Sequence, residues 1–168
     1  MAARIGIVGA GNIGQVHAQA ANWAGSTVVA ICDVDLAKAE ALAAKSENTV
    51  ALASVKDLLA RDDVDAIVVA VPNHAHMDVA IAALAAGRDV LLEKPMAMSV
   101  DECERILGAI NQSNRLLQMG FVCRFAPAAQ AARRLVEVGA LGDSYHAKGF
   151  MYRRRGIPGL GKWFTTKS

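Results

Sequence analysis

Short, continuously apolar segments alternate along this chain with longer alanine-rich segments, and this alternation constrains the fold more than any other feature. The apolar segments are short enough to be strands and cover residues 5–8, 27–32, 49–52, 66–71, 90–92 and 116–119. The segments between them are predicted to be helices and cover residues 13–23, 36–45, 55–60, 75–86 and 100–112. Strands that are apolar at every position are buried on both faces, as in a parallel sheet covered by helices. The sequence therefore predicts a doubly wound parallel α/β domain.

The pattern changes after residue 122, and we expect a domain boundary there. Residues 127–138 are predicted to form one helix, and residues 144–152 the first strand of a different sheet. A lone strand leaves its backbone edge unpaired and does not make a domain. We therefore expect a complete domain over residues 1–122. Over residues 123–168 we expect a linking helix and the truncated start of an α+β domain.

Composition excludes several classes of protein. Apolar residues make up 54% of the chain and charged residues 20%, which excludes a disordered or fibrous protein. The apolar runs, such as residues 66–71, are all far shorter than the roughly 18 residues of a membrane span. The apolar segment near the N-terminus is too short for a signal peptide. We therefore expect a soluble, cytoplasmic protein that has no membrane partner.

Neither a metal site nor a nucleic-acid interface is predicted. The three cysteines have no CxxC spacing, so they indicate no zinc site, and Cys32 is expected to be a small core residue. Residues 133–168 carry 8 Lys and Arg against 2 Asp and Glu. This basic segment is either a tail that binds polyanions or part of a larger domain whose acidic partners are absent. Its arginines lack interleaved aromatic residues and the net charge is only +2, so we expect no nucleic-acid partner.

A glycine-rich turn, Gly-Ala-Gly-Asn-Ile-Gly over residues 9–14, joins the first predicted strand to the first predicted helix. Gly9 permits the tight turn, Gly11 lets the backbone approach a pyrophosphate, and Gly14 lets the helix pack on the strand. The N–H groups of Asn12 and Ile13 lie at the positive end of the helix and can hold the anion. The turn therefore predicts a Rossmann-type dinucleotide site.

An acidic residue follows the second predicted strand and indicates which dinucleotide binds. Asp33 lies nineteen residues past Gly14, where a carboxylate accepts hydrogen bonds from the adenosine ribose hydroxyls. A 2′-phosphate facing this carboxylate would cost on the order of 2–4 kcal/mol at an effective dielectric near 20. Asp35 adds negative charge and Lys38 is the only nearby cation. The sequence therefore favours NAD over NADP.

Two further segments follow the later strands and belong to the same crevice by topology, namely residues 71–76 and 92–96. Lys94 stands at a strand end, where a lysine can donate to a substrate hydroxyl or carbonyl and relay its proton. The alternative is a simple surface ion pair with Glu93. His17, on the first helix, is expected only to pack at the helix surface.

The sequence resembles the Gfo/Idh/MocA oxidoreductases, typified by glucose–fructose oxidoreductase and inositol dehydrogenase, essentially from end to end. The motifs that carry the resemblance are the glycine turn, Asp33 and the segments 72–76, 86–87, 93–96, 124–125 and 139–142. The Glu-Lys-Pro element at this distance from the glycine turn is highly specific to the family, whereas the turn alone is not. Segments 155–158 and 162–165 are similar to the start of the family's second domain.

The resemblance implies hydride transfer between NAD and a ring carbon of a sugar or cyclitol, by an enzyme that is a homo-oligomer at full length. Lys94 would be the catalytic or substrate-orienting lysine beside the cofactor, and Glu93 would bind the nicotinamide ribose. The residues that would line the cofactor groove are Val71, Pro72, Asn73 and His76, and those near the nicotinamide end are Arg124 and Trp163. Family members are longer than this chain, and the catalytic acid–base partner is expected beyond Ser168.

Two other functions stay open at the level of sequence. The first is a non-catalytic protein that binds NAD in order to regulate or sense. The second is an NAD-dependent glycosidase, which the same family contains, and in which the sugar is oxidised only transiently. Steady formation of NADH from a free sugar would distinguish the dehydrogenase from the glycosidase.

Overall fold

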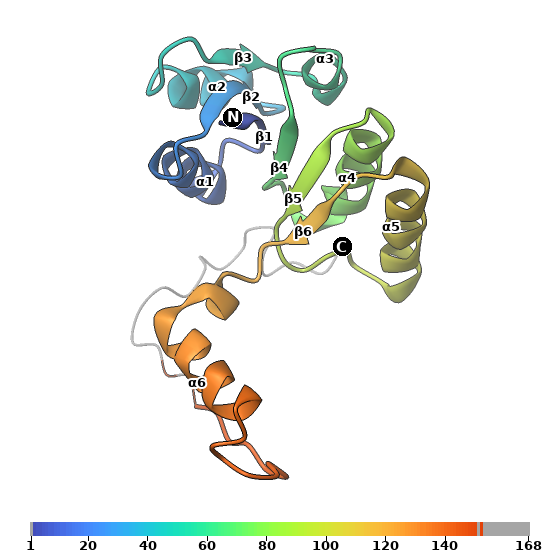
Figure 1. Cartoon of the computed structure of the whole chain (residues 1–168). Helices are drawn as coiled ribbons and strands as arrows, with labels where there is room; N and C mark the ends of the chain where they lie inside the picture. Colours follow the sequence, from blue (N-terminus) through green and yellow to red (C-terminus); the bar gives the residue numbers. More distant parts are fainter. Residues whose placement is uncertain (1, 151, 153–168) are drawn as a thin grey trace. The chain divides into compact units, whose positions relative to one another are not determined.

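The computed structural model describes residues 2–150 and 152, and the chain divides into two compact units, Met1–Gly120 and Phe121–Ser168 (Figure 1). The first unit contains a six-stranded parallel sheet in the order β3-β2-β1-β4-β5-β6. Its strands are β1 Arg4–Val8, β2 Thr27–Cys32, β3 Val50–Leu52, β4 Ala66–Val69, β5 Asp89–Leu92 and β6 Leu117–Met119. Its helices are α1 Asn12–Trp23, α2 Leu36–Ala43, α3 Val55–Leu59, the 3-10 turn η1 Asn73–Ala75, α4 His76–Ala85 and α5 Val100–Ser113. The predicted doubly wound fold is confirmed.

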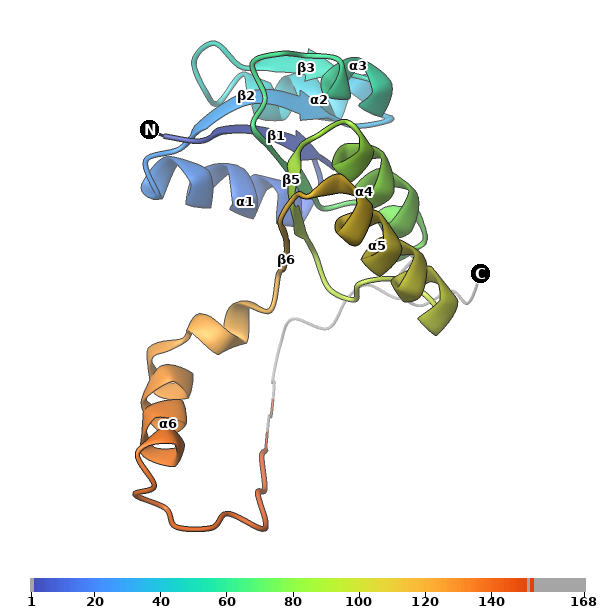
Figure 2. The same ribbon diagram turned by 45° about the vertical axis from the view of Figure 1, so that its right-hand side comes forward.

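The sheet is buried on both faces, and each face has its own core. On one face, Ile7 and Ile31 pack with Leu42 of α2. On the other face, Ile67 packs with Leu84 of α4, and helices α4 and α5 lie side by side (Figure 2). This double burial is the reason that β4 and residues 28–32 of β2 are apolar at consecutive positions rather than at alternate ones.

Local signals set the ends of several helices. The Ser54 hydroxyl accepts a hydrogen bond from the Asp57 backbone N–H at the start of α3, and Ser99 accepts one from Glu102 at the start of α5. Gly87, at φ +73°, follows the end of α4 in the left-handed conformation that glycine adopts most readily. The helix ends at Ala85, one residue before its predicted end at residue 86.

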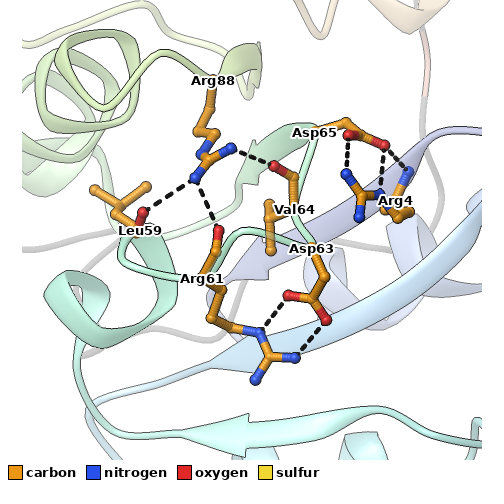
Figure 3. Close-up of polar contacts among 7 residues, drawn as sticks. All are labelled: Arg4, Leu59, Arg61, Asp63, Val64, Asp65 and Arg88. Atoms are coloured by element: carbon orange, nitrogen blue, oxygen red, sulfur yellow. Dashed lines mark hydrogen bonds and ion pairs between the residues drawn. The ribbon is translucent and has the colours of Figure 1, made fainter.

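Two arginines hold the loop that precedes β4 at the amino-terminal edge of the sheet (Figure 3). The Arg4 guanidinium contacts both carboxylate oxygens of Asp65, at 2.7 and 3.1 Å, and lowers the pKa of that carboxyl to about 2. Arg88 donates to the backbone oxygens of Val64 and Arg61, at 2.7 and 2.8 Å. These contacts hold the loop between α3 and β4 against β1 and the start of β5.

The second unit contains the 3-10 turn η2 Val122–Phe125 and helix α6 Pro127–Glu137. Pro127 opens α6, where its missing N–H costs no helical hydrogen bond. The strand predicted over residues 144–152 is absent from residues 144–150 and 152, so that prediction is wrong for these residues. Its loose alternation of apolar residues is not sufficient, because a strand also needs a neighbouring strand for its backbone hydrogen bonds. Among the described residues, no helix is both long and apolar enough to cross a membrane.

Candidate functional site

The carboxyl ends of the central strands lie level with one another at one edge of the sheet. Val8 of β1 pairs with Cys32 of β2 and with Val69 of β4. Val69 in turn pairs with Leu92 of β5. The residues that directly follow these four strand ends are Gly9, Asp33, Ala70 and Glu93. Because ligands of open α/β sheets bind beyond this edge, the register brings the predicted site residues of the first unit to one place.

Two glycines of the turn are required by the fold itself. Gly9 has φ +103°, and a Cβ there would stand 2.3 Å from the carbonyl oxygen of Ala70. A Cβ at Gly14 would stand 1.8 Å from the carbonyl oxygen of Gly9. Both positions therefore exclude every other residue whether or not a ligand is present.

Gly11 is different from the other two glycines. A Cβ at this position would meet no atom within 4 Å, and the backbone is extended, at φ −70° and ψ −170°. Packing and backbone conformation within the described residues therefore give no reason for a glycine at residue 11. The open space beside Gly11 is a place where another molecule's atoms can approach the backbone closely.

The first turn of α1 faces this open space. Gly11 is the N-cap residue and has no side chain with which to accept from the first N–H groups of the helix. Asn12 and Ile13 are exposed, and the first turn carries no acidic residue. A shallow hollow adjoins the turn and is lined partly by Gly11, Asn12, Lys38 of α2 and Lys45, which lies two residues past the end of α2. Unpaired N–H groups, the helix dipole and two lysines together favour an anion here.

Asp33 links the second strand to the glycine turn. Its Oδ2 accepts a hydrogen bond from the Ala10 backbone N–H at 2.8 Å, and its Oδ1 accepts one from Asp35 at 2.9 Å. A carboxylate has about four acceptor positions, so each oxygen retains one for a ligand hydroxyl. Lys38 pairs with Asp35 at 3.0 Å and lowers the pKa of that carboxyl.

Cys32 precedes Asp33 and is a core residue, as predicted. Its side chain is buried, and this burial raises the pKa of the thiol to about 11, with a further contribution from the charge of Asp33. A thiol in this state is a poor nucleophile. Cys32 therefore contributes packing and no chemistry at this edge.

Glu93 has a partner that the sequence analysis missed. The Nε2 atom of His17, on α1, lies 2.9 Å from Glu93 Oε1, and the two side chains are only 12% and 14% exposed. The other oxygen, Oε2, accepts from the Lys94 backbone N–H at 3.2 Å. One sequence signal could have found His17. It lies one helical turn after Gly14, which must face the sheet, so its side chain projects toward the strand ends.

Lys94 is exposed, and its Nζ atom forms no ion pair or hydrogen bond with any of the described residues. The surface ion pair that the sequence left open is therefore not found among them. Lys94 is the second residue after the end of β5 and directly follows Glu93. A lysine so placed is available to a ligand hydroxyl or carbonyl.

His76 connects the loops that follow β4 and β5. Its ring is 1% exposed, with Nδ1 2.7 Å from the carbonyl oxygen of Pro95 and Nε2 3.0 Å from that of Val71. A buried ring with both nitrogens directed at backbone carbonyls holds the two loops together. Pro72 and Asn73 are half-buried in the first of these loops.

The remaining predicted residues lie outside the first unit. Arg124 belongs to the second unit, where its guanidinium lies 5.4 Å from the centre of the Phe121 ring. Trp163 lies outside the described residues. Among the residues that the structure describes, no group of His, Cys, Asp and Glu is arranged to hold a metal ion.

Residues 3–121 match the family described as "Oxidoreductase family, NAD-binding Rossmann fold". Among curated proteins, inositol 2-dehydrogenase 1 of Saccharopolyspora erythraea is 37% identical over 147 residues, which are 85% of this chain and 44% of the relative. The chain spans less than half the length of this relative.

Solved structures show the same partial match. The scyllo-inositol dehydrogenase of Lactobacillus casei, solved with bound NAD(H) and scyllo-inositol, is 29% identical with a TM-score of 0.78, over 85% of this chain and 43% of that one. The WlbA dehydrogenase of Bordetella pertussis, solved with NADH and UDP-GlcNAcA, is 30% identical with a TM-score of 0.79, over 84% of this chain and 44% of that one.

Proposed function

The chain belongs to the Gfo/Idh/MocA family of oxidoreductases, and from this premise we propose that it is the NAD-binding half of a dehydrogenase that acts on a cyclitol or related sugar. Similar proteins named inositol 2-dehydrogenase and scyllo-inositol dehydrogenase support this substrate class. The nicotinamide supplies a hydride acceptor when bound. The side chains and backbone of the protein bind and orient the cofactor and the substrate, and Lys94 acts on the reacting oxygen.

The observation that carries the proposal is the open space at Gly11. Gly9 and Gly14 are explained by contacts within the chain, whereas Gly11 is not. A pyrophosphate against the backbone of Gly11, held by the N–H groups of Asn12 and Ile13, explains why no side chain stands there.

The proposed roles of the other residues follow from the strand ends after which they lie. Asp33 accepts from the adenosine ribose hydroxyls and disfavours the 2′-phosphate of NADP, so NAD is the proposed cofactor. Val71, Pro72 and Asn73 line the groove of the protein that holds the dinucleotide. In this proposal His76 acts through the loops that it joins.

At the nicotinamide end, Glu93 accepts from the second ribose, and Lys94 donates from Nζ to the oxygen on the reacting carbon. Arg124 and Trp163 are proposed to lie near the nicotinamide on the strength of the family resemblance. The contribution of Lys94 is to stabilise the charge that develops on the substrate oxygen and to receive or return its proton.

A pair of glycine substitutions tests dinucleotide binding. The G11A chain is expected to fold normally, because the methyl group meets no protein atom, and to bind NAD at least about tenfold more weakly, because the methyl group occupies the space of the pyrophosphate. The matched control is G108A, in α5, where a Cβ also meets no atom within 4 Å. Titration calorimetry with NAD measures both.

The G108A chain should keep the NAD affinity of the unmodified chain and gain slightly in stability, since alanine favours a helix. Equal NAD affinities for G11A and G108A would contradict the assignment of the glycine turn. An unmodified chain that does not bind NAD would contradict the proposed function itself.

A further inference from the structure

The pair formed by His17 and Glu93 joins two segments that lie 76 residues apart in the chain. His17 is on α1, one turn beyond the glycine turn, and Glu93 directly follows β5. Both side chains are almost buried, at 12% and 14% exposure. The pair therefore connects the element that would hold the pyrophosphate to the residue that would hold the second ribose.

Glu93 is restrained on several sides. His17 engages Oε1 and the Lys94 N–H engages Oε2. A Cβ at Gly120, which follows β6, would lie 3.1 Å from Oε1, so this glycine leaves room for the carboxylate. Each carboxylate oxygen has one protein partner and keeps one acceptor position for a ligand.

We propose that His17 is a positioning residue: it fixes the Glu93 carboxylate in the orientation that accepts the hydroxyls of the nicotinamide ribose. This inference rests on the proposed function. A glutamate side chain that is free to rotate must be ordered when a ligand binds, and that ordering lowers affinity. The contact from His17 orders the carboxylate before the ligand arrives.

The interaction requires a donor at the position of Nε2. Glutamine has the same number of bonds between Cα and its side-chain nitrogen as histidine has between Cα and Nε2, so H17Q can retain the donor. Leucine fills similar space without a donor, so H17L removes the contact. The two variants therefore separate the hydrogen bond from the packing of the side chain.

The experiment measures the affinities of NAD and ADP for the unmodified chain, H17L and H17Q by titration calorimetry. ADP contains the adenosine ribose and the pyrophosphate but lacks the nicotinamide ribose. We expect H17L to bind NAD about tenfold more weakly and to bind ADP within about twofold of the unmodified chain. H17Q should restore most of the NAD affinity. In an E93A background, H17L should have no further effect on NAD binding.

Unchanged NAD affinity in H17L would overturn the proposal. Equal losses for NAD and ADP would also overturn it, because they would show that His17 supports the glycine turn rather than Glu93. Failure of the unmodified chain to bind NAD would instead overturn the proposed function, and the positioning role would fall with it.

A second measurement does not depend on the folding of a variant. The ring nitrogen resonances of His17, observed by NMR in the unmodified chain with labelled histidine, should shift on addition of NAD and stay in place on addition of ADP. The reason is that only NAD brings hydroxyls to the carboxylate that His17 contacts. No shift with NAD under conditions where NAD binds would overturn the proposal.

Discussion

Asp33 has one observed role and one proposed role, and both use its two carboxylate oxygens. It orders the glycine turn through the N–H of Ala10, and in the proposed function it also accepts from the adenosine ribose. An asparagine keeps one oxygen for the turn but removes the negative charge. D33N therefore removes the negative charge and the acceptor for the Asp35 N–H, while the contact with the Ala10 N–H can remain.

The first residue-scale prediction concerns cofactor preference. D33N is expected to weaken NAD binding and to narrow the preference for NAD over NADP by about tenfold, because the 2′-phosphate no longer faces a carboxylate. Titration with NAD and NADP measures the ratio of affinities. D62N, a change of the same kind at an exposed aspartate, is the control and should leave that ratio as it is. If D33N also leaves the ratio unmoved, Asp33 does not contact the ribose.

His76 makes contacts within the chain that do not depend on a ligand. Its ring is buried between the carbonyl oxygens of Val71 and Pro95, so its contacts are with the loops on either side. The sequence identifies it as part of the groove, and the family resemblance implies a role with the cofactor. Whether it also contacts the dinucleotide stays a prediction.

At the scale of elements, the amino-terminal end of the sheet lies opposite the candidate site. It is held by side chains rather than by regular secondary structure. Arg88, at the start of β5, donates to carbonyl oxygens in the loop that leads into β4 (Figure 3). The carbonyl oxygens of Arg61 and Val64 lie outside the strand ladder. Among the described residues, no backbone N–H donates to either of them. The loop that leads into β4 therefore depends in part on the side chain of Arg88, which directly precedes β5.

Replacement of that arginine is expected to destabilise the first unit. R88M keeps the apolar stem but leaves the carbonyl oxygens of Arg61 and Val64 without their donor, and should lower the free energy of unfolding by about 2 kcal/mol. R105M, at an exposed arginine on α5, is the matched control and should change it by less than about 0.5 kcal/mol. Urea unfolding followed by circular dichroism gives both values. Equal stabilities of R88M and R105M would mean that water replaces the lost donor.

The predicted strands also differ in how reliably the sequence predicts them. The six strands of the first unit are recognisable because each is an apolar run between glycine or polar residues, and each has a partner in the sheet. Residues 144–150 have a weaker pattern and no partner strand among the described residues, and they form no strand. Local pattern is sufficient for a strand only when the rest of the chain supplies a neighbour.

At the scale of the whole molecule, the chain spans less than half the length of the relatives that it matches. Catalytic activity should therefore be assayed in the native protein that contains this sequence. The intact mass of that protein, purified from its source, shows which polypeptide to assay.

In that native protein, K94A is expected to lower kcat for cyclitol oxidation by about 100-fold or more, because the reacting oxygen loses its cationic donor. The KM for NAD should stay within about threefold, since Lys94 acts on the substrate rather than on the adenosine half. Formation of NADH, followed by absorbance, measures both quantities. An unaltered kcat would remove Lys94 from the mechanism, and no NADH from any free sugar or cyclitol would favour a regulatory or glycosidase function.

Much of the fold and the dinucleotide turn followed from the sequence alone, because their causes are local. A glycine turn between a strand and a helix extends over six residues, and apolar runs between helices are enough to indicate a parallel sheet. The sequence also placed Asp33 and Glu93 at strand ends, and parallel topology gathers all strand ends at one edge.

The tertiary structure alone decided which side chains meet at that edge. The contact of His17 with Glu93 and that of His76 with Pro95 join residues 76 and 19 positions apart, and no spacing rule specifies such pairs. The tertiary structure also distinguishes the three glycines of the turn. Only their three-dimensional surroundings show that Gly9 and Gly14 are required by packing while Gly11 faces open space. Contacts between distant segments depend on how strands and helices stack, and that arrangement exists only once the sheet has formed.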